Sequence, residues 1–232
     1  MKMKVLSILF IPLLLNINIY GDVVFRIVEL NTENTFDCYH DEGKNDNEFL
    51  PNSPRRWTKN RYYKKITGLC QEIVAIHNNS IPPDIIALTE IENDSVINDI
   101  IHHSILNRLD YKYVMTNSED KRGIDVAMMY QEARFKLLSH HNYKVKYNKH
   151  YTKSRDILYA SGKLINGDTI HIIVCHLSSK LGGKTAKDNR AQQLLTIKTI
   201  KDSICKTTIN PKIIITGDFN DVALSRNMSK TR

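Results

Sequence analysis

Three apolar segments of the chain end in residues that can carry out acid–base or metal chemistry. The segment P-D-I-I-A-L-T-E ends at Glu90, I-H-I-I-V-C-H ends at His176, and K-I-I-I-T-G-D-F-N-D passes through Gly217 to Asp218 and Asn220. Short β-branched runs of this kind predict buried strands, and glycine permits the sharp turn after the last of them. A carboxylate, an imidazole and a carboxylate–amide pair at strand ends suggest a site for hydrolysis.

A fourth predicted strand adds an amide to this set. Residues 23–30 alternate between apolar and polar side chains and lead to Asn31. Asn31 and Glu90 offer hard oxygen donors, the type that Mg²⁺ and Mn²⁺ prefer, and such a metal would polarise a phosphoryl oxygen. In this arrangement Asp218 would accept a proton from the attacking water, and Asn220 would orient the water or the phosphate.

The remaining candidates concern His176 and the substrate phosphate. His176 would donate to the transition state or the leaving oxygen, and it needs an orienting partner, for which Asp125 in I-D-V-A-M-M-Y is the best candidate. Arg155, in S-R-D-I-L-Y, offers a bidentate donor to phosphate. Each residue also has an ordinary structural interpretation, such as a surface ion pair between Arg155 and Asp156.

The elements that must position these residues can be predicted from the periodicity of the sequence. Helical spacing predicts helices over 55–77, 95–109 and 189–205, and residues 37–55 read as an exposed loop. Asn-Gly at 166–167 indicates a hairpin turn. The other predicted strands cover 84–88, 111–115, 124–130, 135–138, 144–147, 157–165, 169–176 and the segment after Pro211. Many short strands with about three helices favour a mixed α/β sandwich within one domain.

The first 21 residues have the pattern of a secretory signal peptide. Lys2 and Lys4 precede an apolar run at 5–15 and a polar exit at 16–21, and this run is too short to span a bilayer comfortably. An uncleaved anchor is the alternative. We therefore expect a domain over 22–232 that is secreted or periplasmic.

Charge and cysteine content narrow the range of partners only slightly. The formal net charge is +8, and removing the leader leaves +6, which suits a polyanion such as nucleic acid or an anionic head group. The basic cluster at 55–65 fits a solvated helix start or a phosphate-backbone contact.

Four cysteines allow up to two disulfides and match no zinc spacing, and we expect Cys70 and Cys175 to be buried thiols.

Together these segments resemble the endonuclease/exonuclease/phosphatase superfamily, which includes pancreatic deoxyribonuclease, abasic-site endonucleases, sphingomyelinases and inositol polyphosphate phosphatases. The likeness runs from about Phe25 to the C-terminus and is greatest to exported bacterial members. It implies a four-layered α/β/β/α sandwich with the site at one edge of the paired sheets. The matching segments are L-N-T-E-N-T-F-D, L-T-E-I-E-N, R-G-I-D-V-A-M-M-Y, S-R-D-I-L-Y, C-H-L-S-S-K-L-G-G, N-R-A-Q-Q and G-D-F-N-D.

The resemblance also implies roles for individual residues. Glu90 corresponds to the metal-binding glutamate of the family, and Asn31 to an asparagine that binds near metal and phosphate. His176 stands where deoxyribonucleases have a catalytic histidine, and Arg155 where they have a phosphate-contacting arginine. The aspartate and asparagine of G-D-F-N-D correspond to the pair assigned to water activation and substrate polarisation.

One departure from the family pattern concerns the C-terminus. Family members continue into further strands and a closing S-D-H motif, whereas this sequence ends at Arg232 with a basic tail. We therefore expect a fragment or frameshifted product that lacks the second catalytic histidine and the last strands. A degenerate, inactive relative and an enzyme that relies on His176 alone are the alternatives.

The functional prediction is an exported, Mg²⁺-dependent phosphodiesterase, specifically an endonuclease that acts on DNA or RNA. A phosphatase or sphingomyelinase acting on phospholipid or inositol phosphate is the alternative within the same fold. A non-catalytic remnant that only binds polyanions is the alternative from another class. We expect a monomer with no stable protein partner.

Overall fold

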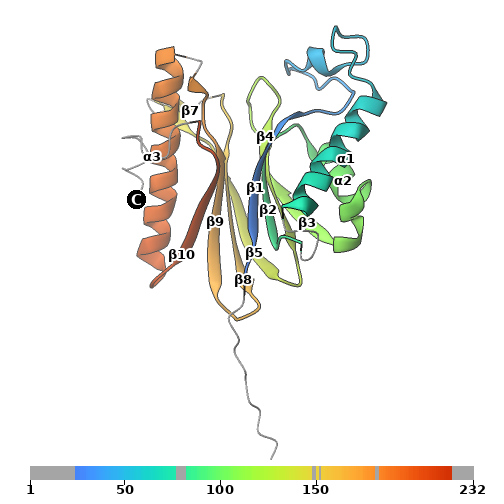
Figure 1. The fold of residues 1–232 in the computed structure, drawn as a ribbon. Coiled ribbons are helices and arrows are strands. Elements are labelled where there is room, and N and C mark those ends of the chain that lie inside the picture. The colour runs from blue at the N-terminus through green and yellow to red at the C-terminus, as the bar shows by residue number, and fades with distance from the viewer. Residues whose placement is uncertain (1–23, 77–81, 148–149, 152, 181–182, 221–232) are drawn as a thin grey trace, which may run out of the picture.

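The computed structural model describes residues 24–76, 82–147, 150–151, 153–180 and 183–220. The predicted signal peptide and the basic C-terminal tail lie outside these described residues. Within the described residues, two four-stranded sheets pack face to face, with helices on both outer faces (Figure 1). This arrangement confirms the predicted α/β/β/α layering.

The first sheet combines one parallel pair with two antiparallel strands. The order across the sheet is β1 (Ile27–Thr35), β2 (Ile85–Ile91), β4 (Asp125–Gln131) and β3 (Tyr111–Met115). β1 and β2 run parallel, whereas β4 is antiparallel to both β2 and β3.

The second sheet repeats this scheme. The order is β10 (Lys212–Asp218), β9 (Thr169–His176), β8 (Ile157–Leu164) and β5 (Phe135–Tyr143). β10 and β9 run parallel, and β8 is antiparallel to both β9 and β5. A separate two-stranded ladder joins β6 (Lys146–Tyr147) to β7 (His150–Tyr151).

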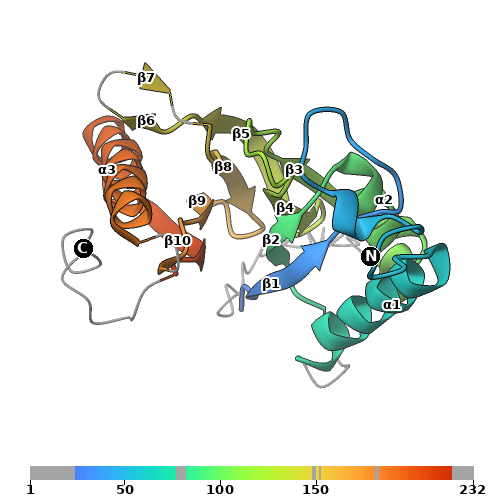
Figure 2. The same ribbon diagram turned by 90° about the horizontal axis from the view of Figure 1, so that it is seen from above.

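Helices cover the outer face of each sheet, as the view from above shows (Figure 2). α1 (Lys59–Ala75) and α2 (Asp94–His102) lie on the first sheet, and α3 (Gly183–Thr207) lies on the second. Short 3₁₀ helices occur at η1 (Asn47–Phe49) and η2 (Ile105–Leu109).

The hydrophobic core lies in three layers that the sequence pattern explains. Between the sheets, Ile85, Met128 and Phe135 pack with no solvent exposure. Beneath α1 the core includes Ile66, and beneath α3 it includes Ile197. Every residue of β2 is buried because both faces of this strand are covered, which accounts for its unbroken apolar run.

Several predicted element boundaries were wrong. β1 continues to Thr35, well beyond the predicted end at Leu30. The helix predicted over 95–109 divides into α2 and η2, because the Ser104 hydroxyl caps the second segment by accepting from the Leu106 N–H. α3 begins at Gly183, six residues before the predicted start.

The loop predicted over 37–55 contains a short helix and a buried aromatic side chain. The loop contains η1 and buries Phe49, which stacks on Phe36 with ring centroids 4.1 Å apart.

Cys70 and Cys175 are buried free thiols as predicted, and Cys205 is an exposed free thiol. None of the helices in the described ranges has the length and apolar character needed to cross a membrane.

Candidate active site

The two parallel strand pairs bring four of the predicted site residues to the same edge of the sandwich. Asn31 in β1 pairs with Thr89 of β2, the residue before Glu90, because these strands run in the same direction. In the other sheet Asp218 of β10 lies directly opposite His176 of β9. β10 contacts both β1 and β2 across the sandwich, so the two pairs of strand ends meet.

The side chains of these four residues form one cluster. The Nε2 atom of His176 lies 3.7 Å from Glu90 Oε1 and 3.8 Å from Asp218 Oδ2. The Asn31 side-chain amide donates to Asp218 Oδ2 over 3.0 Å. The side chain of His176 is only 3% exposed, whereas that of Asp218 is 29% exposed, so the cluster opens to solvent on the Asp218 side.

Glu90 reaches this cluster through a local distortion of its strand. The pairing of β2 with β4 shifts register between Thr89 and Ile91, and Glu90 between them has a φ of 64°. The Thr32 hydroxyl lies within hydrogen-bond distance of the carbonyl oxygens of Thr89 and Glu90 and holds the distortion. A non-glycine residue in this conformation costs on the order of 1–3 kcal/mol, and such strain gathers at functional sites. The bulge turns the carboxylate of Glu90 toward the site edge.

Asp218 depends on Gly217 for its position. Gly217 has a φ of 123°, and a Cβ atom at this position would lie 1.9 Å from the carbonyl oxygen of Cys175 in β9. The two strands therefore approach each other in a way that only glycine allows. This close approach places Asp218 beside His176.

The predicted pairing of Asp125 with His176 was wrong. Asp125 is buried, and its carboxylate accepts from the Thr116 hydroxyl at 2.5 Å and from the Ser118 N–H at 3.0 Å. The carboxylate therefore holds the turn between β3 and β4. Within the described residues, the Nδ1 atom of His176 has no hydrogen-bond partner.

Arg155 and Asn220 lie next to the cluster and share one acceptor. Arg155 Nη2 and Asn220 Nδ2 donate to the carbonyl oxygen of Leu177 over 3.3 and 2.9 Å. Asn220 also donates its backbone N–H to Asp218 Oδ1 over 2.8 Å. Arg155 is buried, and its Nε atom has no partner among the described residues, so this guanidinium keeps a free donor.

Two further cations lie at the site: Arg122, to which the sequence prediction gives no role, and Lys65, the last residue of the basic cluster at 55–65. Arg122 donates to the side chain of Asn34 over 2.6 Å and lies 3.8 Å from Glu90 Oε1. Lys65 donates to the carbonyl oxygen of Glu33 over 2.9 Å. Arg122 begins R-G-I-D-V-A-M-M-Y, one of the segments that resemble the family, but the resemblance assigns no role to this arginine.

The electrostatics of the site favour a neutral histidine among charged neighbours. Burial, and then the positive charges of Arg155 and Arg122, lower the pKa of His176 to about 2. His176 therefore offers a hydrogen bond from a neutral ring in the resting protein. Burial lowers the pKa of Lys65, and the charges of Glu33 and Glu90 act in the opposite direction.

The donor set fits a divalent cation bound by few protein ligands. Glu90 Oε2 accepts from the Asn34 N–H, whereas Oε1 has no hydrogen-bond donor among the described residues. No group of three or more His, Cys, Asp or Glu side chains in the described ranges is arranged to hold a metal by itself. Mg²⁺ suits such a site because it binds one or two carboxylates and completes its shell with water and substrate phosphate.

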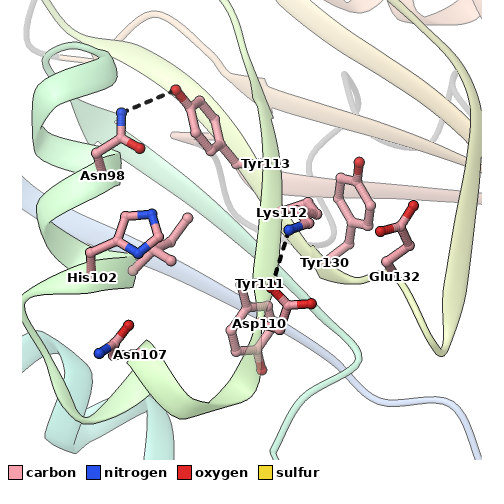
Figure 3. Close-up of a pocket in the computed structure, with 10 residues that line it drawn as sticks. Asn98, His102, Asn107, Asp110, Tyr111, Lys112, Tyr113, Tyr130 and Glu132 are labelled. Atoms are coloured by element: carbon pink, nitrogen blue, oxygen red, sulfur yellow. Dashed lines mark hydrogen bonds and ion pairs between the residues drawn. The ribbon is translucent and has the colours of Figure 1, made fainter.

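A pocket of about 560 Å³ lies away from this cluster, at the edge strand β3 (Figure 3). Tyr111 and Tyr130 line it, and Tyr130 pairs with Ile85 at the opposite end of β2 from Glu90. Ile85 and Glu90 are five residues apart in β2, which places the pocket about 17 Å from Glu90 along the strand. Within the pocket, Lys112 lies 3.1 Å from Asp110, and Asn98 donates to the Tyr113 hydroxyl. We therefore place the active site at the four strand ends.

Comparisons with known proteins agree with this geometry. Residues 26–232 match the family model described as "Endonuclease/Exonuclease/phosphatase family". No curated protein matches the sequence at a significant level.

Solved structures with similar folds come from several organisms. The human Nocturnin catalytic domain with bound sulfate is 18% identical with a TM-score of 0.61, over 88% of this chain and 68% of that one. The Bacteroides thetaiotaomicron mannosyl-6-phosphatase is 14% identical with a TM-score of 0.62, over 90% of this chain and 70% of that one. The D. rerio TDP2 complex with single-strand DNA product is 18% identical with a TM-score of 0.50, over 71% of this chain and 56% of that one. The chain thus spans between 56% and 70% of the length of these structures.

Proposed function

Because the chain belongs to the endonuclease/exonuclease/phosphatase family, we propose that it is a divalent-metal-dependent phosphodiester hydrolase that acts on nucleic acid. The observation that carries this proposal is the meeting of Glu90, His176 and Asp218 at one edge of the sandwich. Two carboxylates and a neutral imidazole surrounded by cations are suited to hydrolysis of a phosphate ester.

Each residue has a role that follows from its surroundings. Glu90 and Asn31 would hold the cation, which we propose to be Mg²⁺ with Mn²⁺ as a substitute, and which supplies charge neutralisation at the phosphoryl oxygen. Asp218 faces solvent more than Glu90 does, so it is placed to accept a proton from water. The neutral ring of His176 would donate a hydrogen bond to the developing negative charge.

Substrate binding would depend on cations around the carboxylates. Arg122 has a half-exposed side chain that lies 3.8 Å from Glu90, and the buried Arg155 has a free donor at Nε. These charges, together with the positive net charge of the chain, favour a polyanion. The TDP2 structure with single-strand DNA product supports nucleic acid as the substrate class. We propose that residues 1–21 direct export of the enzyme.

A plasmid-nicking assay tests this function. The full chain is incubated with supercoiled plasmid and Mg²⁺, and we expect nicking that EDTA stops. Asp218→Asn should lower the rate by about a hundredfold or more, because the group that accepts the proton is lost. Asp110→Asn is the matched control, since the Asp110 side chain is 84% exposed and remote from the cluster. Nicking that survives EDTA and Asp218→Asn would refute the proposal.

A phosphatase is the second candidate, because a mannosyl-6-phosphatase has a similar fold. Mannose 6-phosphate, an inositol phosphate and a sphingomyelin vesicle can be assayed beside the plasmid. Phosphate or head-group release without nicking would favour this candidate. Salt-sensitive plasmid binding without turnover of any substrate would indicate a non-catalytic polyanion-binding protein.

A further inference from the structure

The peptide group between Leu177 and Ser178 is held on both sides by side chains. The carbonyl oxygen of Leu177 accepts from Arg155 and Asn220, as described above. The N–H of Ser178, in the same peptide group, donates to Gln193 Oε1 over 2.8 Å. Because a peptide group is planar, the Leu177 carbonyl and the Ser178 N–H can only turn together.

Gln193 and its neighbour Arg190 are unusual for their place on α3. Gln193 is 1% exposed and Arg190 is 6% exposed, although polar residues of a helix on an outer layer usually face solvent. Arg190 Nη1 donates to the carbonyl oxygen of Ser178 over 2.9 Å. The two residues are three apart in N-R-A-Q-Q, so they lie on the same face of α3.

We propose that Gln193 and Arg190 are positioning residues for the active site. Gln193 fixes the plane of the 177–178 peptide group, and that plane directs the side chains of Asn220 and Arg155. Arg190 fixes the next peptide group along the chain. The roles given to Asn220 and Arg155 rest on the proposed hydrolytic function, whereas the arrangement of the peptide group does not.

A simpler role for Gln193 would be to attach α3 to the loop after β9. Loss of Gln193 would then lower stability without altering how Asn220 contributes to the rate. In our proposal Gln193 acts through Asn220 and Arg155. Removing Gln193 should therefore have a smaller effect once Asn220 has been removed, because one of the two side chains through which it acts is gone and the effects of coupled residues are not additive.

The kinetic experiment uses Gln193→Met in the full chain, which keeps the length of the side chain and removes the acceptor. We expect kcat/KM for plasmid nicking to fall by about tenfold or more, because a buried N–H loses its partner and the peptide group turns. In the Asn220→Ala background the same change should cost less than about threefold. Gln193→Glu restores the acceptor oxygen and should recover activity to within about threefold of wild type.

Gln192→Met is the matched control, because it makes the same change one residue away on a side chain with no hydrogen bond to the 177–178 peptide group. It should leave kcat/KM unchanged. Fully additive losses for Gln193→Met and Asn220→Ala, or a Gln193→Glu variant as impaired as Gln193→Met, would overturn the proposal. Circular dichroism melts confirm that each variant is folded at the assay temperature.

A second measurement does not require turnover and separates this inference from the proposed function. Crystal structures of the wild-type chain and Gln193→Met are compared at the 177–178 peptide group. The proposal predicts a rotated peptide group and loss of the contacts of Arg155 and Asn220 with Leu177. Unchanged contacts would overturn it even if the wild-type chain proves active. A rotated peptide group in an inactive chain would support the positioning role and refute the hydrolytic function.

Discussion

Replacing Gly217 with alanine should destabilise the protein and displace Asp218. The new Cβ atom would lie 1.9 Å from the carbonyl oxygen of Cys175 and 2.9 Å from the carbonyl carbon and backbone nitrogen of that residue. All three atoms belong to the backbone of β9, which is fixed by pairing on both sides. The clash therefore cannot be relieved by rotating a side chain.

The expected magnitude combines two costs. A φ of 123° is unfavourable for alanine by on the order of 1–3 kcal/mol. Forcing atoms into a packed region costs about 1–3 kcal/mol more. The free energy of unfolding should therefore fall by about 2–6 kcal/mol, which corresponds to a decrease in Tm of roughly 4–24 °C for a domain of this size.

The assay is a thermal or urea melt of wild type, Gly217→Ala and a control, followed by circular dichroism. Gly68→Ala is the control, because Gly68 lies in α1 with no atom within 4 Å of a Cβ at that position. It should raise the free energy of unfolding by up to about 1 kcal/mol. A Gly217→Ala protein that melts within 1 °C of wild type would refute the close approach of β9 and β10.

Other predictions test the packing and the charges of the same fold. Gly162→Ala should cost about 1–3 kcal/mol in urea melts, because its Cβ would lie 2.3 Å from the Phe135 ring, and Phe135→Leu in the same chain should relieve part of that clash; additive losses would contradict this explanation. Arg134→Ala should cost about 3 kcal/mol, because it leaves the buried Asp84 carboxylate without its ion pair at 2.7 Å, and a loss below 0.5 kcal/mol would argue against that pair. Burial, and then the charge of Asp125, raise the pKa of Asp156 to about 6, so this group lowers the free energy of unfolding as the pH rises from about 4 to 6. Asp156→Asn should therefore be more favourable relative to wild type at pH 7 than at pH 4, by on the order of 1–2 kcal/mol, and an equal effect at both pH values would contradict the raised pKa.

The sequence allowed the strand ends to be predicted but not the details of how they meet. Glu90, His176 and Asp218 follow β-branched runs. Parallel pairing brings Asn31 close to Glu90 in one sheet and His176 to Asp218 in the other, whereas the two pairs meet through packing of the sheets. The bulge at Glu90 has no counterpart in the sequence pattern, because it depends on contacts with Thr32 from another strand.

The errors in the prediction arose from contacts between distant segments. Asp125 occurs at the end of β4 that lies nearest the site. Its carboxylate instead accepts a hydrogen bond from the N–H of Ser118 in the adjacent turn. Arg122 and Lys65 are long side chains on a turn and a helix, and their contacts depend on how these elements pack. The division of the helix over 95–109 could have been predicted, because Ser104 is a favourable N-cap residue.

The most direct test of the account measures plasmid nicking against Mg²⁺ concentration for wild type and Glu90→Gln. Glu132→Gln is the control, since Glu132 is an exposed carboxylate at the remote pocket. We predict Mg²⁺-dependent nicking by wild type and the control, and loss of at least about a hundredfold in rate for Glu90→Gln. Nicking by Glu90→Gln at the wild-type rate, with the same dependence on Mg²⁺, would contradict the assignment of the active site to these strand ends.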